Sequence, residues 1–285
     1  NFAKAIIPTI TVDEVSALAK KHLNRKNMVI VAQGPSEGVK HITKEEAIAV
    51  LDKVESSNLE PYKDQVTEAS LINEDLKGSK IIATKKLPQF DAEEWTLENG
   101  AKVVFRKADY EKDQVQVSSY SKGGTSLYGI DKLASAQVTD QFIGAYGLTG
   151  KQAQAGVSIG GLSESVGGAS TPNDFETLMQ LIYLRFEKPR FDKEVHNTMM
   201  QRNYAAIENS ANNPQKIMQD SINMIMSNYS PRTLLFGKEF LDKVSIEQIE
   251  EIYRDRIKDI SDFTFFIVGN IDAETVKPLV EKYLG

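Results

Sequence analysis

A helix followed by a strand is predicted twice in this sequence, near its two ends, and this repeat constrains the fold more than any other feature. The first copy combines a capping-box spacing that opens at Thr11 with an apolar run at residues 28–32, which predicts a buried strand. The second combines the same spacing at Ser245 with an apolar run at residues 263–268. The repeat predicts the tail of one domain and nearly all of a second, related domain. Because helix–strand pairs are common, coincidence is the alternative.

Between the two copies, short apolar runs alternate with turn and capping signals, which is typical of a mixed α and β domain. Asn99-Gly100 predicts a tight hairpin, since both residues accept the positive φ angles of such a turn. We expect the end of a preceding domain at residues 1–60, a linker at 61–93 and a second domain at 94–285. The predicted elements after the first copy are a helix at 43–55, strands at 80–84, 95–97, 101–106 and 114–120, a helix at 130–146, two strands within 152–169, helices at 172–187, 192–209, 214–228 and 245–258, a strand at 263–268 and a helix at 272–284.

The charge balance and the absence of cysteine exclude several classes of protein. The net charge is -6, whereas a nucleic-acid-binding protein needs a basic face for the phosphates. The lack of cysteine excludes disulfides, thiolate nucleophiles and Cys-ligated zinc. No apolar run reaches the roughly 18 residues that span a bilayer. We expect no nucleic-acid partner and no membrane span. Because the chain opens without an initiator Met or a signal segment, we also expect it to be a piece of a longer polypeptide.

Three segments resemble the pitrilysin/insulinase (M16) zinc metallopeptidases, in the order in which that family has them. WTLENGAKVV at residues 95–104 resembles the L-x-N-G-x-x-V hairpin that opens each domain of the family, and FTFFIVGNID at 263–272 resembles the strand that closes it. FETLMQLIYLRF at 175–186, followed by Pro189 and Phe191, is similar to a helix and loop of the bacterial, periplasmic branch. The resemblance implies an α+β fold of the LuxS/MPP-like type. In that fold, repeated domains each carry a mostly antiparallel sheet packed on one face by helices, and two halves close around a peptide.

The active domain of this family carries H-x-x-E-H on the helix after its third strand, where two His bind zinc and the Glu activates the metal-bound water. The segment that matches this helix, residues 133–143, contains neither His nor Glu, and the later stretch at 195–204 offers no carboxylate. The three His of the chain lie in three different segments, which favours ordinary packing or surface roles: His22, His41 and His196. The resemblance therefore implies no catalytic residue and no metal in this chain, and zinc in the N-terminal half of the parent protein.

Substrate-binding candidates follow from the same resemblance, since the non-catalytic half of the family turns Arg and Tyr side chains toward the peptide. The candidates are Tyr229 and Arg232, beyond a predicted helix, and Ser163, Glu164 and Ser165 in the Gly-rich strands; ordinary loop and strand positions are the alternative.

Two further expectations concern packing and length. The methionines of the two central helices are expected in a helix core: Met199, Met200, Met218, Met224 and Met226. Residues 147–151 depart from the family, because relatives carry a longer, helix-bearing excursion at that place; either this protein has lost the excursion or residues are missing from the sequence there.

The function that the resemblance implies is that of a non-catalytic, substrate-enclosing region of a zinc metalloendopeptidase that degrades peptides. Its partners would be an unfolded peptide and the catalytic N-terminal half of the same polypeptide, with a homodimer as a further candidate. The compartment implied is the bacterial periplasm. The alternative is an inactive binding or structural subunit that pairs with an active peptidase. A zinc motif upstream in the same polypeptide would favour the first hypothesis.

Overall fold

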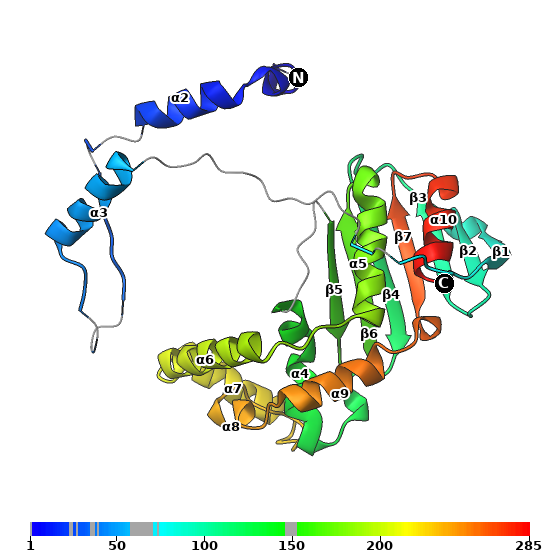
Figure 1. The fold of residues 1–285 in the computed structure, drawn as a ribbon. Coiled ribbons are helices and arrows are strands. Elements are labelled where there is room, and N and C mark those ends of the chain that lie inside the picture. The colour runs from blue at the N-terminus through cyan, green and yellow to red at the C-terminus, as the bar shows by residue number, and fades with distance from the viewer. Residues whose placement is uncertain are drawn as a thin grey trace. The chain divides into compact units, whose positions relative to one another are not determined.

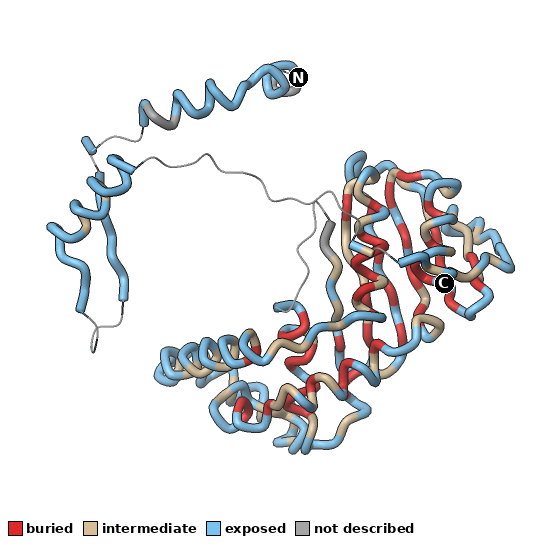
Figure 2. Tube along the Cα trace, viewed as in Figure 1, coloured by how far each residue is buried: buried red, intermediate tan, exposed pale blue. Residues whose placement is uncertain are grey.

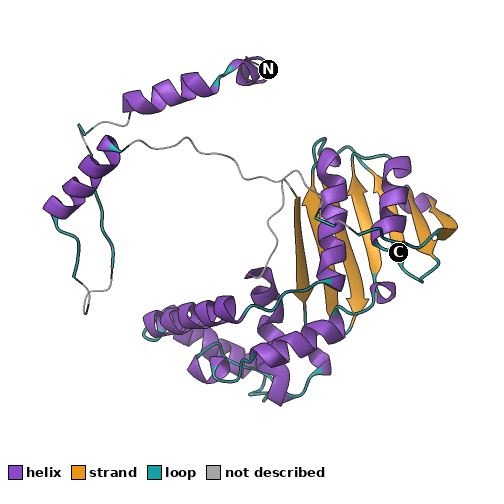
Figure 3. Ribbon diagram, in the orientation of Figure 1, coloured by secondary structure: helices purple, strands orange, loops and turns teal. Residues whose placement is uncertain are grey.

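The computed structural model of the chain describes residues 2–22, 25–26, 28–34, 38, 40–57, 71–72, 74–145 and 153–285. The chain divides into two compact units, Asn1–Gln65 and Val66–Gly285. Figure 1 labels the helices and strands of each unit, and Figure 3 shows that strands occur in the second unit among the described residues.

The first unit consists of helices joined by irregular segments: α1 (Phe2–Ile6), the 3-10 turn η1 (Ile7–Thr9), α2 (Val12–His22) and α3 (Lys44–Ser56). Both longer helices begin at the expected capping boxes. Thr11 donates its backbone N–H to Glu14 and accepts a bond from the Glu14 backbone, and Thr43 and Glu46 repeat this pattern. Arg25 joins the segment after α2 to α3 through ion pairs with Asp52 and Glu55.

The prediction of a strand at residues 28–32 is wrong. Residues 28–34 have no regular secondary structure, and the side chains of Met28, Val29, Ile30 and Val31 are exposed. A strand satisfies its backbone N–H and C=O groups through a neighbouring strand, and the described part of this unit contains none. The predicted equivalence of two helix–strand pairs therefore fails, because the first copy has the helix without the strand. The boundaries proposed for the three regions remain a prediction.

The second unit is built on one seven-stranded sheet with the order β1-β2-β3-β7-β4-β6-β5. Its strands are β1 (Ile81–Leu87), β2 (Ala92–Leu97), β3 (Lys102–Lys107), β4 (Val115–Lys122), β5 (Ala153–Ile159), β6 (Ser163–Ser170) and β7 (Thr264–Gly269). Neighbours are antiparallel except β3 and β7, which are parallel. The last strand in the sequence thus lies in the middle of the sheet.

The hairpin of β2 and β3 forms as its sequence predicts. Gly100 has a φ of +98°, in the region that favours glycine, and Leu97 and Ala101 close the turn with a backbone hydrogen bond of 2.9 Å. The Asn99 side-chain oxygen accepts a bond from the Ala101 backbone N–H. The turn residues therefore set the register of the two strands through local contacts.

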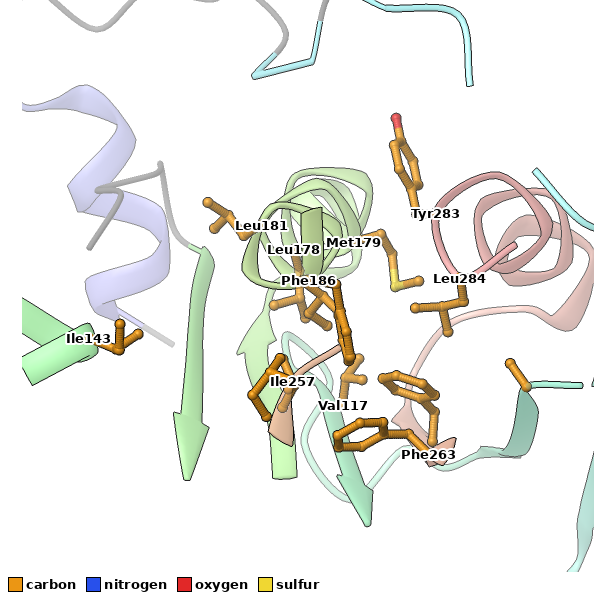
Figure 4. Close-up of a cluster of buried hydrophobic side chains, with 14 of the residues drawn as sticks. Val117, Ile143, Leu178, Met179, Leu181, Phe186, Ile257, Phe263, Tyr283 and Leu284 are labelled. Atoms are coloured by element: carbon orange, nitrogen blue, oxygen red, sulfur yellow. The ribbon is translucent and has the colours of Figure 1, made fainter. Parts of the chain in front are cut away.

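The helices of this unit are α4 (Ile130–Ala145), α5 (Phe175–Glu187), α6 (Lys193–Ser210), α7 (Pro214–Met226), α8 (Lys238–Leu241), α9 (Ile246–Arg256) and α10 (Ala273–Tyr283). Helices α5 and α10 lie over the same face of the sheet (Figure 1). Side chains from both helices and from the strands, among them Met179, Leu284 and Val117, gather between them into one hydrophobic core (Figure 4). On the sheet, Trp95 and Phe105 stack with ring centroids 5.1 Å apart.

The methionine prediction is right for one helix and wrong for the next. On α6, Met199 and Met200 are half-buried and pack against the core. On α7, Met224 is half-buried, whereas Met218 and Met226 are 59% and 81% exposed, so these two are not core residues. A helical spacing of apolar residues predicts an apolar face but cannot say what covers that face.

Candidate functional site

Helix α4 follows strand β4 in the sequence. The resemblance puts the zinc-binding helix of the family at this place. The apolar side chains of α4 point into the core: Leu133, Ala134, Ala136, Val138, Phe142 and Ile143 are all buried. Its buried polar groups are satisfied within the domain. Ser135 donates to Gln248 of α9 at 2.8 Å, and Thr139 donates to the Ser135 carbonyl. The helix therefore serves packing, and its exposed positions carry no imidazole or carboxylate pair suited to a metal.

The three histidines lie in three separate parts of the sequence. His22 ends α2 and His41 precedes α3, both in the first unit, whereas His196 lies on α6 in the second. His196 is 8% exposed and its ring packs against Phe142 with centroids 5.0 Å apart. Among the described residues, no group of three or more His, Asp or Glu side chains could hold a metal ion.

The sheet face opposite the core is open and carries a mixed set of side chains. Along β4, residues alternate between buried and exposed, which places Gln116, Ser118 and Tyr120 on the open face. The register sets Ser118 beside Phe266 of β7, and Phe266 beside Val104 of β3. Phe266 and Tyr120 are 39% and 48% exposed. Figure 2 shows the same alternation of buried and exposed positions along the strands.

Small residues continue this open face toward the β5 edge. Gly156 pairs with Gly167, and Ser158 pairs with Ser165. At the end of these strands the surface is hollowed into an open depression of about 1090 Å³, lined by Glu111, Lys112, Gln116, Gly156, Gly168 and Ala169, with other residues of the same strands. A face with apolar and hydroxyl side chains in its middle and room at one end can accept side chains of varied shape.

The predicted candidates on β6 divide between the two faces. Ser163 and Ser165 are half-buried and belong to the open face, with Ser163 paired to Lys122 of β4. Glu164 points the other way and is 3% exposed. Its carboxylate accepts a hydrogen bond of 2.6 Å from the Gly124 backbone N–H and lies 3.7 Å from the Arg256 guanidinium. The structure thus leaves Ser163 and Ser165 as the β6 candidates that face outward.

Glu164 holds one side of the loop at residues 123–128, which leads from β4 into α4. Gly124 has a φ of +73°, and a Cβ there would stand 2.3 Å from the Gly160 carbonyl oxygen, so this position requires glycine. Thr125 donates its N–H to that same carbonyl at 2.8 Å.

Arg232 holds the other side of the 123–128 loop. Its guanidinium donates to the carbonyl oxygens of Tyr128 at 2.9 Å and Thr125 at 3.2 Å. The other candidate of that segment, Tyr229, is 65% exposed and makes no hydrogen bond with the described residues of this loop. The sequence candidates Glu164 and Arg232, chosen separately, therefore meet at one loop, whereas Tyr229 lies apart from it.

The electrostatics of this loop favour a fixed structure. Burial raises the pKa of Glu164, although the bond from Gly124 and the charge of Arg256 oppose this effect. Burial and a hydrogen bond to Asp255 raise the pKa of Tyr128, whose hydroxyl donates to that carboxylate at 2.7 Å. Burial alone would raise the pKa of Asp255, but bonds from Tyr128 and Arg256 outweigh it and lower that pKa. Glu164, Asp255 and Arg256 each have a charged or hydrogen-bonding partner within the domain, so these contacts hold the loop at the start of α4.

Sequence reasoning missed the partners that complete this loop: Gly124, Tyr128, Asp255 and Arg256. They come from two segments far apart in the sequence, the loop itself and the end of α9, and no short motif connects them. The Gly123-Gly124 pair was the one local signal, since consecutive glycines between two predicted elements indicate a turn with unusual backbone angles.

Comparison with known proteins places these features in context. No family model matches the chain. It is 22% identical over 286 residues to a protein of Arabidopsis thaliana described as zinc protease PQQL-like, which covers 99% of this chain and 28% of the relative. It is 23% identical over 215 residues to the probable zinc protease PqqL of Haemophilus influenzae, covering 68% of this chain and 22% of the relative. The chain therefore spans less than a third of the length of these curated relatives.

Solved structures share the fold. The periplasmic protease PqqL from Escherichia coli matches with a TM-score of 0.66 and 17% identity, over 85% of this chain and 28% of that one. A peptidase M16 inactive domain from Pseudomonas fluorescens matches with a TM-score of 0.53 and 16% identity, over 68% of this chain and 50% of that one. The expected α+β fold with a mostly antiparallel sheet is confirmed. None of the described helices has the length and apolar character needed to cross a membrane.

Proposed function

Because the chain belongs with the M16 peptidases in sequence and in fold, we propose that it is a non-catalytic region of a zinc-dependent metalloendopeptidase. In this role it helps to enclose an unfolded peptide, while the zinc ion and its H-x-x-E-H helix belong to the N-terminal half of the same polypeptide. On this proposal, the chain forms part of the surface that encloses the peptide, and it supplies no ligand to the zinc ion.

The observation that carries this proposal is the state of helix α4. It occupies the place of the family's zinc helix, yet its inward side chains are core residues such as Leu133 and Phe142. Hydrolysis of a peptide bond requires an activated water, which this family obtains from zinc and an adjacent Glu. A domain of this fold without those groups retains the sheet and the packing but loses the means to activate water.

The open sheet face supports the enclosing role. It offers an aromatic centre at Phe266 and Tyr120, and hydroxyl groups at Ser118 and Ser165. Unfolded peptides present both apolar side chains and unpaired backbone groups, which such a mixed face can accommodate without sequence preference. Of the candidate residues, Ser163 and Ser165 are proposed to contact substrate directly. Tyr229 is left out of the proposed contact surface, because it lies beyond α7 and apart from the 123–128 loop. Glu164 and Arg232 are proposed to support them through the 123–128 loop.

The compartment and partners follow the same relatives. The Escherichia coli neighbour is described as periplasmic, and we extend that location to this chain as part of the proposal. The proposed partners are an unfolded peptide and the catalytic half of the polypeptide, with a homodimer as a further candidate.

A second function is favoured by one specific observation, the likeness to a domain described as an M16 inactive domain. On this alternative, the whole protein is an inactive subunit that binds an active peptidase. The two functions differ in what the rest of the polypeptide contains.

Cleavage of a quenched fluorescent peptide tests the proposal. The purified chain should give no turnover, with or without added zinc, and the full-length polypeptide should give turnover that a chelator abolishes. Chelator-sensitive turnover by this chain alone would overturn the assignment of a non-catalytic role. A full-length polypeptide that binds the peptide without cleaving it would favour the inactive-subunit alternative.

A further inference from the structure

Helix α7 turns its apolar face away from its own domain. The exposed side chains on this face are Ile217 (55%), Met218 (59%), Ile222 (43%), Ile225 (61%) and Met226 (81%). They recur at helical spacing and so lie on one side of the helix. A surface helix of a globular domain normally buries its apolar side against the core. Helix α7 instead exposes its apolar side.

The opposite side of α7 carries mostly polar residues. The half-buried residues of the helix and its C-cap are Lys216, Asp220, Met224 and Ser227, again at helical spacing. Lys216 and Asp220 form an ion pair whose side chains are 30% and 27% exposed. In the described part of the chain, no residue of α7 is among those that pack against the hydrophobic core. The inward side of α7 thus carries an ion pair made within the helix and the single methionine Met224, whereas most of the apolar side chains of the helix are exposed.

The end of α7 extends the same surface with an aromatic side chain. Asn228 and Tyr229 have φ values of +52° and +54°, which non-glycine residues adopt rarely. The turn is nevertheless well bonded, since Tyr229 donates its backbone N–H to the Met224 carbonyl at 2.8 Å. Tyr229 is 65% exposed. A strained backbone that presents an exposed tyrosine beside an apolar face resembles the aromatic anchor of a protein interface.

We infer that the outward face of α7, defined as Ile217, Met218, Ile222, Ile225, Met226 and Tyr229, docks against another part of the same full-length polypeptide. This inference rests on the proposed function, in which the chain is one region of a larger peptidase. The chain covers 28% of the Arabidopsis relative and 28% of the Escherichia coli neighbour. In both proteins, most of the polypeptide lies outside the matched region and is available to cover such a face.

The composition of the outward face favours a permanent intramolecular partner. The face has aliphatic and thioether side chains and one phenol, and it has no charged group, because Lys216 and Asp220 lie on the inward side. Permanent interfaces resemble a divided hydrophobic core, whereas a substrate site needs polar groups to orient its ligand. An apolar face of this kind left uncovered would promote aggregation.

Thiol labelling tests the inference, because the chain contains no cysteine. Met226→Cys is compared with Leu162→Cys, a position of similar exposure (81% and 77%) in the turn between β5 and β6. Both variants are reacted with a small maleimide in two contexts, the 285-residue chain and a full-length polypeptide freed of other cysteines. We expect similar rates in the chain. In the full-length polypeptide, Met226→Cys should react at least about tenfold more slowly and Leu162→Cys at its former rate.

Equal rates for Met226→Cys in both contexts would overturn the inference, and Met218→Cys provides a second reporter if Met226→Cys does not fold. If Met226→Cys in the 285-residue chain reacts more slowly as the protein concentration rises, a second copy of the chain covers the face. That result would also overturn the inference. Peptide cleavage measured on the same full-length samples separates the two proposals. An active polypeptide with an accessible Met226→Cys site contradicts the docking surface and leaves the proposed function standing.

Discussion

The carboxylate of Glu164 on β6 and the guanidinium of Arg256 at the end of α9 face each other at 3.7 Å, with side chains 2% and 18% exposed. This pair joins the sheet to the helix layer beside the loop that leads into α4. Glu164 also accepts the Gly124 N–H, so its charge is shared between a cation and a backbone donor.

Removing that charge should destabilise the domain. Glu164→Gln keeps the shape of the side chain but leaves Arg256 and Gly124 with a neutral partner. We expect the free energy of unfolding in urea to fall by about 1–3 kcal/mol. Glu250→Gln is the control, because its pair with Arg254 is exposed on both sides (43% and 55%) and should change the free energy by less than about 0.5 kcal/mol. Equal effects of the two substitutions would contradict the buried role of Glu164.

Arg232→Ala should loosen the 123–128 loop without unfolding the domain. The substitution removes the donors to the Thr125 and Tyr128 carbonyls. We expect the amide hydrogens of residues 125–128 to exchange roughly fivefold faster, which corresponds to about 1 kcal/mol of local opening. The control is Arg202→Ala on exposed α6 surface, which should leave these amides unchanged. Unchanged exchange in the Arg232 variant would show that the loop is held by other contacts.

His196 should make stability depend on pH near neutrality. Burial lowers the pKa of His196, and the charge of Glu247 opposes this only in part. The unfolded chain then binds more protons than the folded chain between the folded value and the ordinary value of 6.5. Stability should therefore fall as the pH falls through 6.5, and should not change above it on account of this residue.

His196→Phe is the matching substitution, because the His196 Nδ1 atom is buried without a partner and the ring packs against Phe142. We expect its free energy of unfolding at pH 7 to stay within about 1 kcal/mol of the unsubstituted value. Its loss of stability from about pH 7 to about pH 5.5 should be smaller than that of the unsubstituted chain. The same loss in both proteins would assign the pH dependence to other groups.

The isolated chain should not retain zinc. It has no thiolate and no helical His pair, so a bound ion would lack the three or four ligands that zinc requires. After incubation with zinc and dialysis, elemental analysis should find far less than one ion per chain. One tightly bound zinc per chain would contradict the placement of the metal site in another region.

Local signals predicted the parts of this fold that depend on neighbours in sequence. The Asn99-Gly100 turn and the Thr43 capping box formed as expected, because their hydrogen bonds are made within a few residues. The strand at residues 28–32 failed because a strand depends on a partner that the described part of its unit does not supply. The prediction that Met226 is buried was wrong for a similar reason, because the spacing of apolar residues does not identify what covers a helix.

The candidate site shows the same limit. Glu164 and Arg232 were selected from the sequence, but their common loop could not be, because it is assembled from β6, α9 and the segments after β4 and α7. The absence of zinc ligands from α4 was readable directly, since it depends on residue identity alone.

The central position of β7 in the sheet has a consequence for folding during synthesis on the ribosome. β3 and β4 are synthesised well before β7, yet each takes β7 as a neighbour, and β7 is the last strand of this sheet in the sequence. The middle of the sheet can therefore close only when synthesis of this region is almost complete. Until then Phe265 and Ile267 are missing from the core, and the open strands are a template for misassembly. Such long-range closure also makes the folding of this domain slow for its size.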